Sequence, residues 1–235
     1  GCAALACGRV AGWAAVCGWG GRVGVAHLAR LQGVRAAARE RAGVAGGGPD
    51  LAGGLTIDID ATITIAHSEK ENAASTWKKS FGFHPLLAYL DRPDVSGGEG
   101  LAGILRPGNA GSNTTADHVQ ILAMALAALP EYARPRPGAK KSPQVLVRTD
   151  SAGATYGFAA ACREAGCGFS LGFAVDEPVR EAILALPQRA WSPADDIHGA
   201  PTGGTCVADL TGLPKRRKGP SRARVRARAH SPHPR

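Results

Sequence analysis

The chain has 235 residues, 44% of them hydrophobic and 5% aromatic, which is enough for one domain of ordinary size with extensions. Its formal net charge of +9 comes from one segment. Residues 214–235 hold nine lysines and arginines and no acidic residue, and the other 19 of the 28 basic residues balance the 19 acidic ones. The six cysteines form no CxxC pair and lie at no zinc-ligand spacing to a histidine, which argues against a zinc site and favours the reducing cytosol. Arg9 and several glycines interrupt the apolar stretch over residues 1–21, which argues against a membrane span.

The N-terminal region contains one regular element before the main domain. Residues 1–23 show no convincing period, whereas residues 24–43 are rich in Ala and Arg, with apolar residues at steps of three and four, which predicts a helix. The glycine-rich stretch GGGPDLAGG then marks a linker. We expect the main domain to begin near Leu51.

Three strands are predicted next along the chain. The stretch from Leu55 to Ala66 is apolar and β-branched, a second strand follows Pro85, and a third occupies residues 101–108. Because the spacers between them include turn sequences such as RPDVSGGEG, the three strands are expected to form an antiparallel meander.

Helices and strands alternate in the following segment. Thr115 or Asp117 can cap a helix that runs to Pro130, and the short apolar run QVLVRTD is a strand that ends at Asp150. The remaining elements are a helix over 154–166 with Cys162 as a small core residue, a strand over 168–175, and a helix over 176–186 with Asp176 as its N-cap. This order predicts an α/β fold, a mixed sheet flanked by helices.

Two aspartates stand inside the first predicted strand, where a carboxylate is costly to desolvate unless it is paired or bound to a metal. Asp58 and Asp60 are two residues apart and therefore face the same side of a strand. If the strand that ends at Asp150 lies parallel beside the first one, its carboxylate and that of Asp60 can share divalent cations, an arrangement that suits phosphodiester chemistry. The alternative is that one of these acids faces water at the strand edge.

Three segments, LTIDIDATITIAHSEKENAASTWKKSFGFHPLLAYLD, LRPGNAGSNTTADH and VLVRTDSAGAT, resemble bacterial insertion-sequence transposases with a DDE catalytic domain of the group-one type. The resemblance runs from about residue 30 to residue 213. It implies a ribonuclease-H-like fold with three antiparallel strands followed by alternating helices and strands, which is the order reached above from the residues.

The resemblance also implies the site residues. The first catalytic aspartate of the family precedes a small residue and a threonine, which Asp60, Ala61 and Thr62 match best, and the second matches Asp150. These acids are expected to hold two Mg²⁺ (or Mn²⁺) ions, with Asp58 as a weaker metal ligand. The ions would activate water to nick DNA at the ends of the element, and the freed 3′-hydroxyl would then attack target DNA.

The third acid of the family, a glutamate on a helix well beyond the ADLTGL segment, has no counterpart in the matching region. The family pattern is lost after Leu213, and neither Glu177 nor Asp209 lies where the glutamate is needed. The expectation is therefore a truncated transposase that cannot cut or join DNA by itself.

Three regions follow from this comparison. Residues 1–50 are an N-terminal segment, partly helical, residues 51–213 are a partial catalytic domain, and residues 214–235 are a basic, disordered tail. The tail, like residues 1–23, could be a frameshift product. Its charge fits either a solvated segment or one that binds nucleic acid.

Several basic side chains are candidate DNA contacts. Lys70, Lys78 and Lys79 could line a DNA-facing loop beside the acids, although a polar hairpin connection is the alternative. Arg106 is a further candidate, although the Gly and Asn residues that follow it favour a turn. The expected partner is DNA, at the element ends and at the target, in the nucleoid of the cytoplasm, with no membrane; a homo-oligomer is left open.

Two other classes of protein compete with this interpretation. The stretch LTIDIDATI also fits haloacid-dehalogenase-like phosphohydrolases, with Asp58 as nucleophile and Asp60 as general acid, and a strand that pairs back on the first one would argue against that class. The other alternative is a non-catalytic nucleic-acid-binding remnant.

Overall fold

The computed structural model describes residues 25–67, 69–92, 94–95, 98–111, 114–196, 199–211 and 223–230. The chain divides into two compact units, Gly1–Gly172 and Phe173–Arg235, so a boundary falls inside the range that the sequence suggested as one domain. Among the described residues, no helix combines the length and apolar character that a membrane crossing requires.

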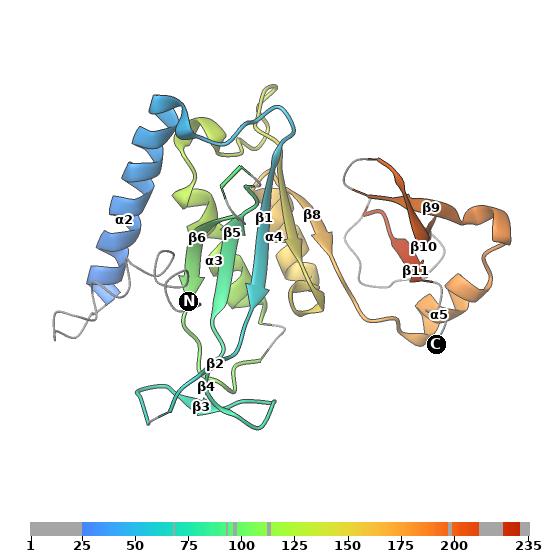
Figure 1. The fold of residues 1–235 in the computed structure, drawn as a ribbon, viewed down its shortest axis with the longest axis horizontal. Helices are drawn as coiled ribbons and strands as arrows, with labels where there is room; N and C mark the ends of the chain where they lie inside the picture. The colour runs from blue at the N-terminus through green and yellow to red at the C-terminus, as the bar shows by residue number, and fades with distance from the viewer. Residues whose placement is uncertain are drawn as a thin grey trace. The chain divides into compact units, whose positions relative to one another are not determined.

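A five-stranded mixed sheet forms the centre of the first unit (Figure 1). Its strands, in spatial order, are β6 (Glu99–Ile104), β5 (Leu86–Leu90), β1 (Leu55–Ala61), β7 (Val145–Thr149) and β8 (Gly168–Leu171). β5 pairs antiparallel with both β1 and β6, whereas β7 lies parallel to β1 and to β8. The mixed α/β architecture and the antiparallel meander predicted from the sequence are confirmed.

Strand β1 has one buried and one open face because its residues alternate in character. Leu55, Ile57 and Ile59 are buried, and the intervening Thr56, Asp58 and Asp60 are partly or fully exposed. The predicted strand over residues 55–66 is shorter than expected, because the chain leaves the central sheet after Ala61.

Two helices, α3 (Thr115–Ala128) and α4 (Tyr156–Glu164), cover the buried face of the sheet. The apolar residues of α3 recur at steps of three and four, as the periodicity predicts, and its N-cap position is Thr114 rather than Thr115 or Asp117. In α4, the fully buried Phe158 and Cys162 contribute to the core, which confirms the predicted role of Cys162.

A second, small sheet interrupts the meander between β1 and β5. It consists of β2 (Thr64–Ile65), β3 (Ala74–Ser75) and β4 (Phe81–Phe83), with β4 paired antiparallel to both neighbours. In Figure 1 this small sheet lies beyond the end of β1 at which Asp60 is found. The sequence predicted only a polar connection here, because strands of two or three residues are too short to show a period.

Gly82 is the residue of β4 that allows this close strand pairing. Its φ is +155°, and a Cβ at this position would lie 2.1 Å from the carbonyl oxygen of Thr64. We expect Gly82→Ala to lower the free energy of unfolding by about 1–3 kcal/mol, the usual cost of such backbone strain, as measured by urea denaturation. Gly53→Ala, with no neighbouring atom within 4 Å of its Cβ, is the control, and equal unfolding midpoints for the two variants would contradict this prediction.

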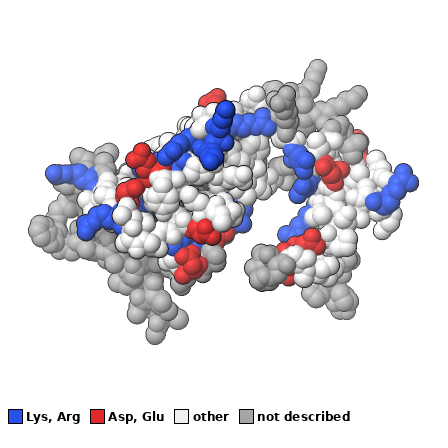
Figure 2. Space-filling view, turned by 90° about the horizontal axis from the view of Figure 1, so that it is seen from above, with Lys and Arg blue, Asp and Glu red and all other residues white. Residues whose placement is uncertain are grey.

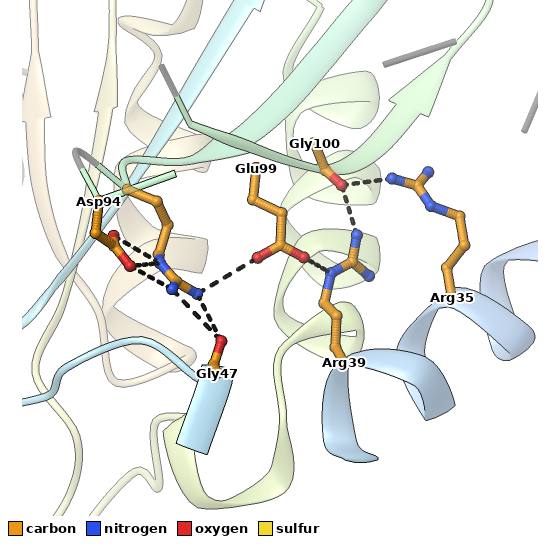
Figure 3. Close-up of polar contacts among 7 residues, drawn as sticks. Arg35, Arg39, Gly47, Asp94, Glu99 and Gly100 are labelled. Carbon is orange, nitrogen blue, oxygen red and sulfur yellow. Dashed lines mark hydrogen bonds and ion pairs between the residues drawn. The ribbon is translucent and has the colours of Figure 1, made fainter. Parts of the chain in front are cut away.

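The helix predicted over residues 24–43 is α2 (Val25–Ala42), and polar contacts join it to the edge strand β6 (Figure 3). The Arg35 guanidinium donates to the Gly100 carbonyl at 2.7 Å, and Arg39 pairs with Glu99 and also donates to Gly100. Arg92, which pairs with Asp94, also approaches Glu99 at 3.8 Å. Charged side chains therefore hold α2 against the sheet edge. Residues 1–23, in which the sequence shows no convincing period, lie outside the described residues.

Short helical turns complete the first unit and part of the second. They are η1 (Gly43–Gly47), η2 (Glu131–Ala133), η3 (Ser151–Gly153) and η4 (Gln188–Ala190).

The described residues of the second unit include one α-helix and a three-stranded antiparallel sheet. Its elements are α5 (Glu177–Leu184), β9 (Ser192–Asp195), β10 (Pro201–Asp209) and β11 (Arg226–His230), with β10 in the centre of the sheet. Asp176 caps α5 as predicted, by accepting a hydrogen bond from the Val179 amide.

Strand β11 differs from the expectation of a disordered tail over residues 214–235. The alternation of arginine with small or apolar residues has the period of a strand, so Ala227 is buried against Leu210 and Val179 while Arg226 and Arg228 are exposed. The sequence analysis did not predict this strand because the high positive charge of the segment indicated a disordered tail. Residues 214–222 and 231–235 of the predicted tail lie outside the described residues.

Candidate active site

The parallel pairing of β1 with β7 brings the two predicted catalytic aspartates to neighbouring strand ends. In this register Asp58 lies beside Arg148 and Ile59 beside Thr149, so the next residues are Asp60 in β1 and Asp150 directly after β7. Neighbouring strands are about 5 Å apart, a separation at which two carboxylates can share an ion. The neighbouring placement expected from the sequence is therefore present, and the role of the two residues stays a prediction.

Local backbone amides orient both carboxylates. The Asp60 carboxylate accepts a hydrogen bond from the Ala61 amide at 2.8 Å. Asp150 is the N-cap of η3 and accepts from the Ala152 amide, also at 2.8 Å. Both aspartates are exposed, and in the part of the chain that the structure describes neither forms an ion pair with a lysine or arginine.

The chemistry of these two donors fits a hard divalent cation. Carboxylate oxygens are the ligands that Mg²⁺ and Mn²⁺ prefer, and Mg²⁺ commonly takes one or two carboxylates and completes its coordination with water and substrate phosphates. The described residues contain no group of three or more His, Cys, Asp or Glu side chains that could hold a metal ion, so an ion here would depend on this pair.

Asp58, the third predicted ligand, is engaged in a different interaction. Arg148 donates to both of its carboxylate oxygens, at 2.6 and 2.7 Å, and to Asp91 at 3.0 Å. The hydrogen bonds that Arg148 donates to Asp58 raise the pKa of its guanidinium above its ordinary value. Asp58 therefore forms an ion pair with Arg148, and its role as a metal ligand stays a prediction. Sequence reasoning missed this ion pair because it did not consider Arg148 as a cross-strand partner.

Arg106 is buried, with only 4% of its surface exposed. Its guanidinium donates to the His84 carbonyl at 3.0 Å, to Thr114 and Asp117 at 3.1 Å each, and to the Gly111 carbonyl at 3.3 Å. Burial raises the pKa of the Asp117 carboxyl, but the hydrogen bonds that Thr114 and Arg106 donate to it hold this pKa below its ordinary value. These contacts tie the loop before α3 to His84, which follows β4, and do not favour the predicted DNA contact by Arg106.

The three predicted lysines are exposed on the small sheet and its connections. Lys78 and Lys79 lie in the turn between β3 and β4, which a hydrogen bond between the Thr76 and Ser80 hydroxyls closes at 2.6 Å, and Lys70 lies before β3. The same turn presents Trp77, which is 72% exposed, with the Lys78 ammonium 5.0 Å from its ring centroid.

Trp77 was missed as a candidate, although a tryptophan next to two lysines is a signal for nucleic-acid contact that the sequence already contains.

Figure 2 views the molecule from the end of the sheet at which β1 begins, opposite the end that carries Asp60. Basic and acidic side chains are intermixed over the described part of the first unit in this view. A uniformly basic surface, which DNA binding favours, is not what this end presents.

The pairing of β5 with β1 bears on the phosphohydrolase alternative. The strand that follows the acidic strand in the central sheet returns to it antiparallel, with Asp58 opposite Tyr89 and Asp60 opposite Leu87. This is the observation that the sequence suggested as evidence against that class. The Arg148 ion pair on Asp58, its proposed nucleophile, argues in the same direction.

The family model described as "Transposase DDE domain group 1" matches residues 9–201. No curated protein matches the chain.

Proposed function

The chain belongs to the group 1 family of transposase DDE domains, and from this membership we propose that it is a DNA transposase of an insertion sequence, with Asp60 and Asp150 as its metal-binding acids. The observation that carries the proposal is the position of these two exposed carboxylates at the ends of adjacent parallel strands. The order of the central sheet fits the ribonuclease-H-like fold that we propose for the first unit.

The proposed mechanism rests on what the two aspartates and their supports do. Bound Mg²⁺ or Mn²⁺ would supply charge stabilisation and an activated nucleophile for cleavage and joining of phosphodiesters. The Ala61 and Ala152 amides hold one oxygen of each carboxylate, which leaves the other oxygen of each free of these local bonds. Asp60 and Asp150 thus offer a preoriented anionic pair that would hold the cation, and the cation would offset the repulsion between these carboxylates and a DNA phosphate.

No third acid is part of this proposal. Glu177 pairs with Arg180 at 3.0 Å on α5, and Asp209 lies at the end of β10, so both belong to the second unit. Neither is assigned a catalytic role.

The test is metal-dependent nicking of a duplex that carries an element end. Nicking in magnesium that is lost on replacement of Asp60 or Asp150 supports the transposase. A salt-dependent gel shift without cleavage would instead support the non-catalytic nucleic-acid-binding protein, the second candidate, which the exposed Trp77 and lysines also fit.

We further propose that the turn with Trp77, Lys78 and Lys79 contacts DNA. Lys78→Gln combined with Lys79→Gln should weaken duplex binding and lower the slope of log K against log salt by about 0.9 for each lysine that contacts a phosphate. Trp77→Leu should weaken binding to single-stranded DNA by about 1–3 kcal/mol, the usual contribution of a base stacked on an aromatic ring. Fluorescence anisotropy at several salt concentrations measures both effects.

Lys140 and Lys141 provide the matched control for these variants. They are also an adjacent exposed pair, but they precede β7 and lie near the loop at the start of β1, the other end of the sheet. Lys140→Gln with Lys141→Gln should leave the salt slope unchanged. Equal slopes for the two lysine pairs would exclude the turn as a specific contact.

A further inference from the structure

Arg148 lies on the open face of the central sheet, in contact with two carboxylates that the proposed mechanism does not use. It donates two hydrogen bonds to Asp58 and one to Asp91, and these acids come from β1 and from the end of β5. With 47% of the Arg148 side chain exposed, the pair contributes little to stability. A role in the electrostatics of this face explains the three hydrogen bonds that Arg148 donates to Asp58 and Asp91 better than a role in stability does.

Without Arg148, several carboxylates on this face would compete for the same cation. Asp58 and Asp60 are two residues apart on β1 and face the same side, about 7 Å from each other along the strand. Asp91 already lies within reach of the group that binds Asp58, because one guanidinium contacts both. A divalent ion could therefore bind Asp58 with Asp91, away from Asp150.

We propose that Arg148 is a positioning residue that acts as a built-in counter-cation, occupying Asp58 and Asp91 so that a divalent ion is directed to Asp60 and Asp150. This inference rests on the proposed function, since it concerns the same metal site. The planar guanidinium suits the role because it fills both oxygens of Asp58 at once while reaching a second acid, which a lysine ammonium cannot reproduce.

The test measures Mn²⁺ binding, by electron paramagnetic resonance and by titration calorimetry, on the full chain without DNA. Asp60→Asn should lose most Mn²⁺ binding. Adding Arg148→Gln to Asp60→Asn should restore binding at least tenfold, because Asp58 and Asp91 are released as ligands. Adding Asp58→Asn to that double variant should abolish the restored binding, a result that a merely structural role for Arg148 does not predict.

The matched control is Arg180→Gln in the Asp60→Asn background. Arg180 also forms an exposed ion pair with a carboxylate, Glu177, but in the second unit, so its loss should restore no Mn²⁺ binding.

If Arg148→Gln does not fold by circular dichroism, Arg148→Lys keeps the charge and should restore binding to a smaller extent. Failure of the folded Arg148 variants to gain Mn²⁺ affinity over their parent overturns the proposal.

The proposed function and this inference fail in different ways. If the wild-type chain binds no Mn²⁺ but Arg148→Gln does, the Asp60–Asp150 site is wrong and the blocking role of Arg148 stands. If the wild type binds Mn²⁺ through Asp60 and the Arg148 variants gain nothing, the site stands and the role of Arg148 is wrong.

Discussion

Asp60→Asn and Asp150→Asn are each expected to lower Mn²⁺ affinity, to remove any magnesium-dependent nicking of an element-end duplex that the wild type shows, and to leave DNA binding in place. The neutral amide keeps the size of the side chain but removes half of the charge of a two-carboxylate site. The loss of Mn²⁺ affinity should exceed the roughly 10–100-fold that follows removal of a group that merely supports a metal ligand. Single-turnover nicking and Mn²⁺ titration measure the two losses.

Asp50→Asn is a close control for this prediction. Asp50 is also exposed and also accepts a hydrogen bond from the amide two residues later, as Asp150 does, but it precedes β1 at the opposite end of the sheet. It should nick DNA like the wild type. Magnesium should raise the thermal midpoint of the wild type and of Asp50→Asn, because a bound ion stabilises the folded state, and should have no effect on Asp60→Asn.

The result that would contradict the catalytic assignment is equally definite. A wild-type chain that binds DNA, shows no metal-dependent nicking and has a thermal midpoint unaffected by magnesium would not be a working metal enzyme. The non-catalytic nucleic-acid-binding candidate would then remain.

Phe158→Ala is expected to have the largest effect on stability, lowering the free energy of unfolding by about 3–5 kcal/mol, the usual cost of truncating a fully buried phenylalanine. The Phe158 side chain is completely buried, and its ring meets His118 of α3 edge-on, with the centroids 5.4 Å apart. Its removal leaves a cavity between α3, α4 and the sheet. Urea denaturation followed by circular dichroism measures the loss.

Tyr156→Ala separates burial from helix propensity in this experiment. Tyr156 lies on the same helix and is 59% exposed, so its truncation should change the unfolding free energy by about 0.5 kcal/mol or less. Similar losses in the two variants would show that Phe158 does not hold α4 on the sheet.

The order of the central elements could be predicted from the sequence because their patterns are local. The alternation over Leu55–Ala61 and the three- and four-residue steps within Thr115–Ala128 both reflect which side chains face the core. The short strands β2, β3 and β4 could not be predicted, since two or three residues do not establish a period. Strand β11 was missed because its alternating arginines read as a charged tail.

The sequence by itself determined the succession of strands and helices, the family, and the choice of Asp60 and Asp150 as candidate acids, because these depend on residue type and spacing within short segments. Only the tertiary structure decided that Arg148 occupies Asp58 and that Arg106 is buried. Each of these outcomes depends on contacts between residues far apart in the chain, and strand register and burial are set by the packed sheet rather than by any one segment.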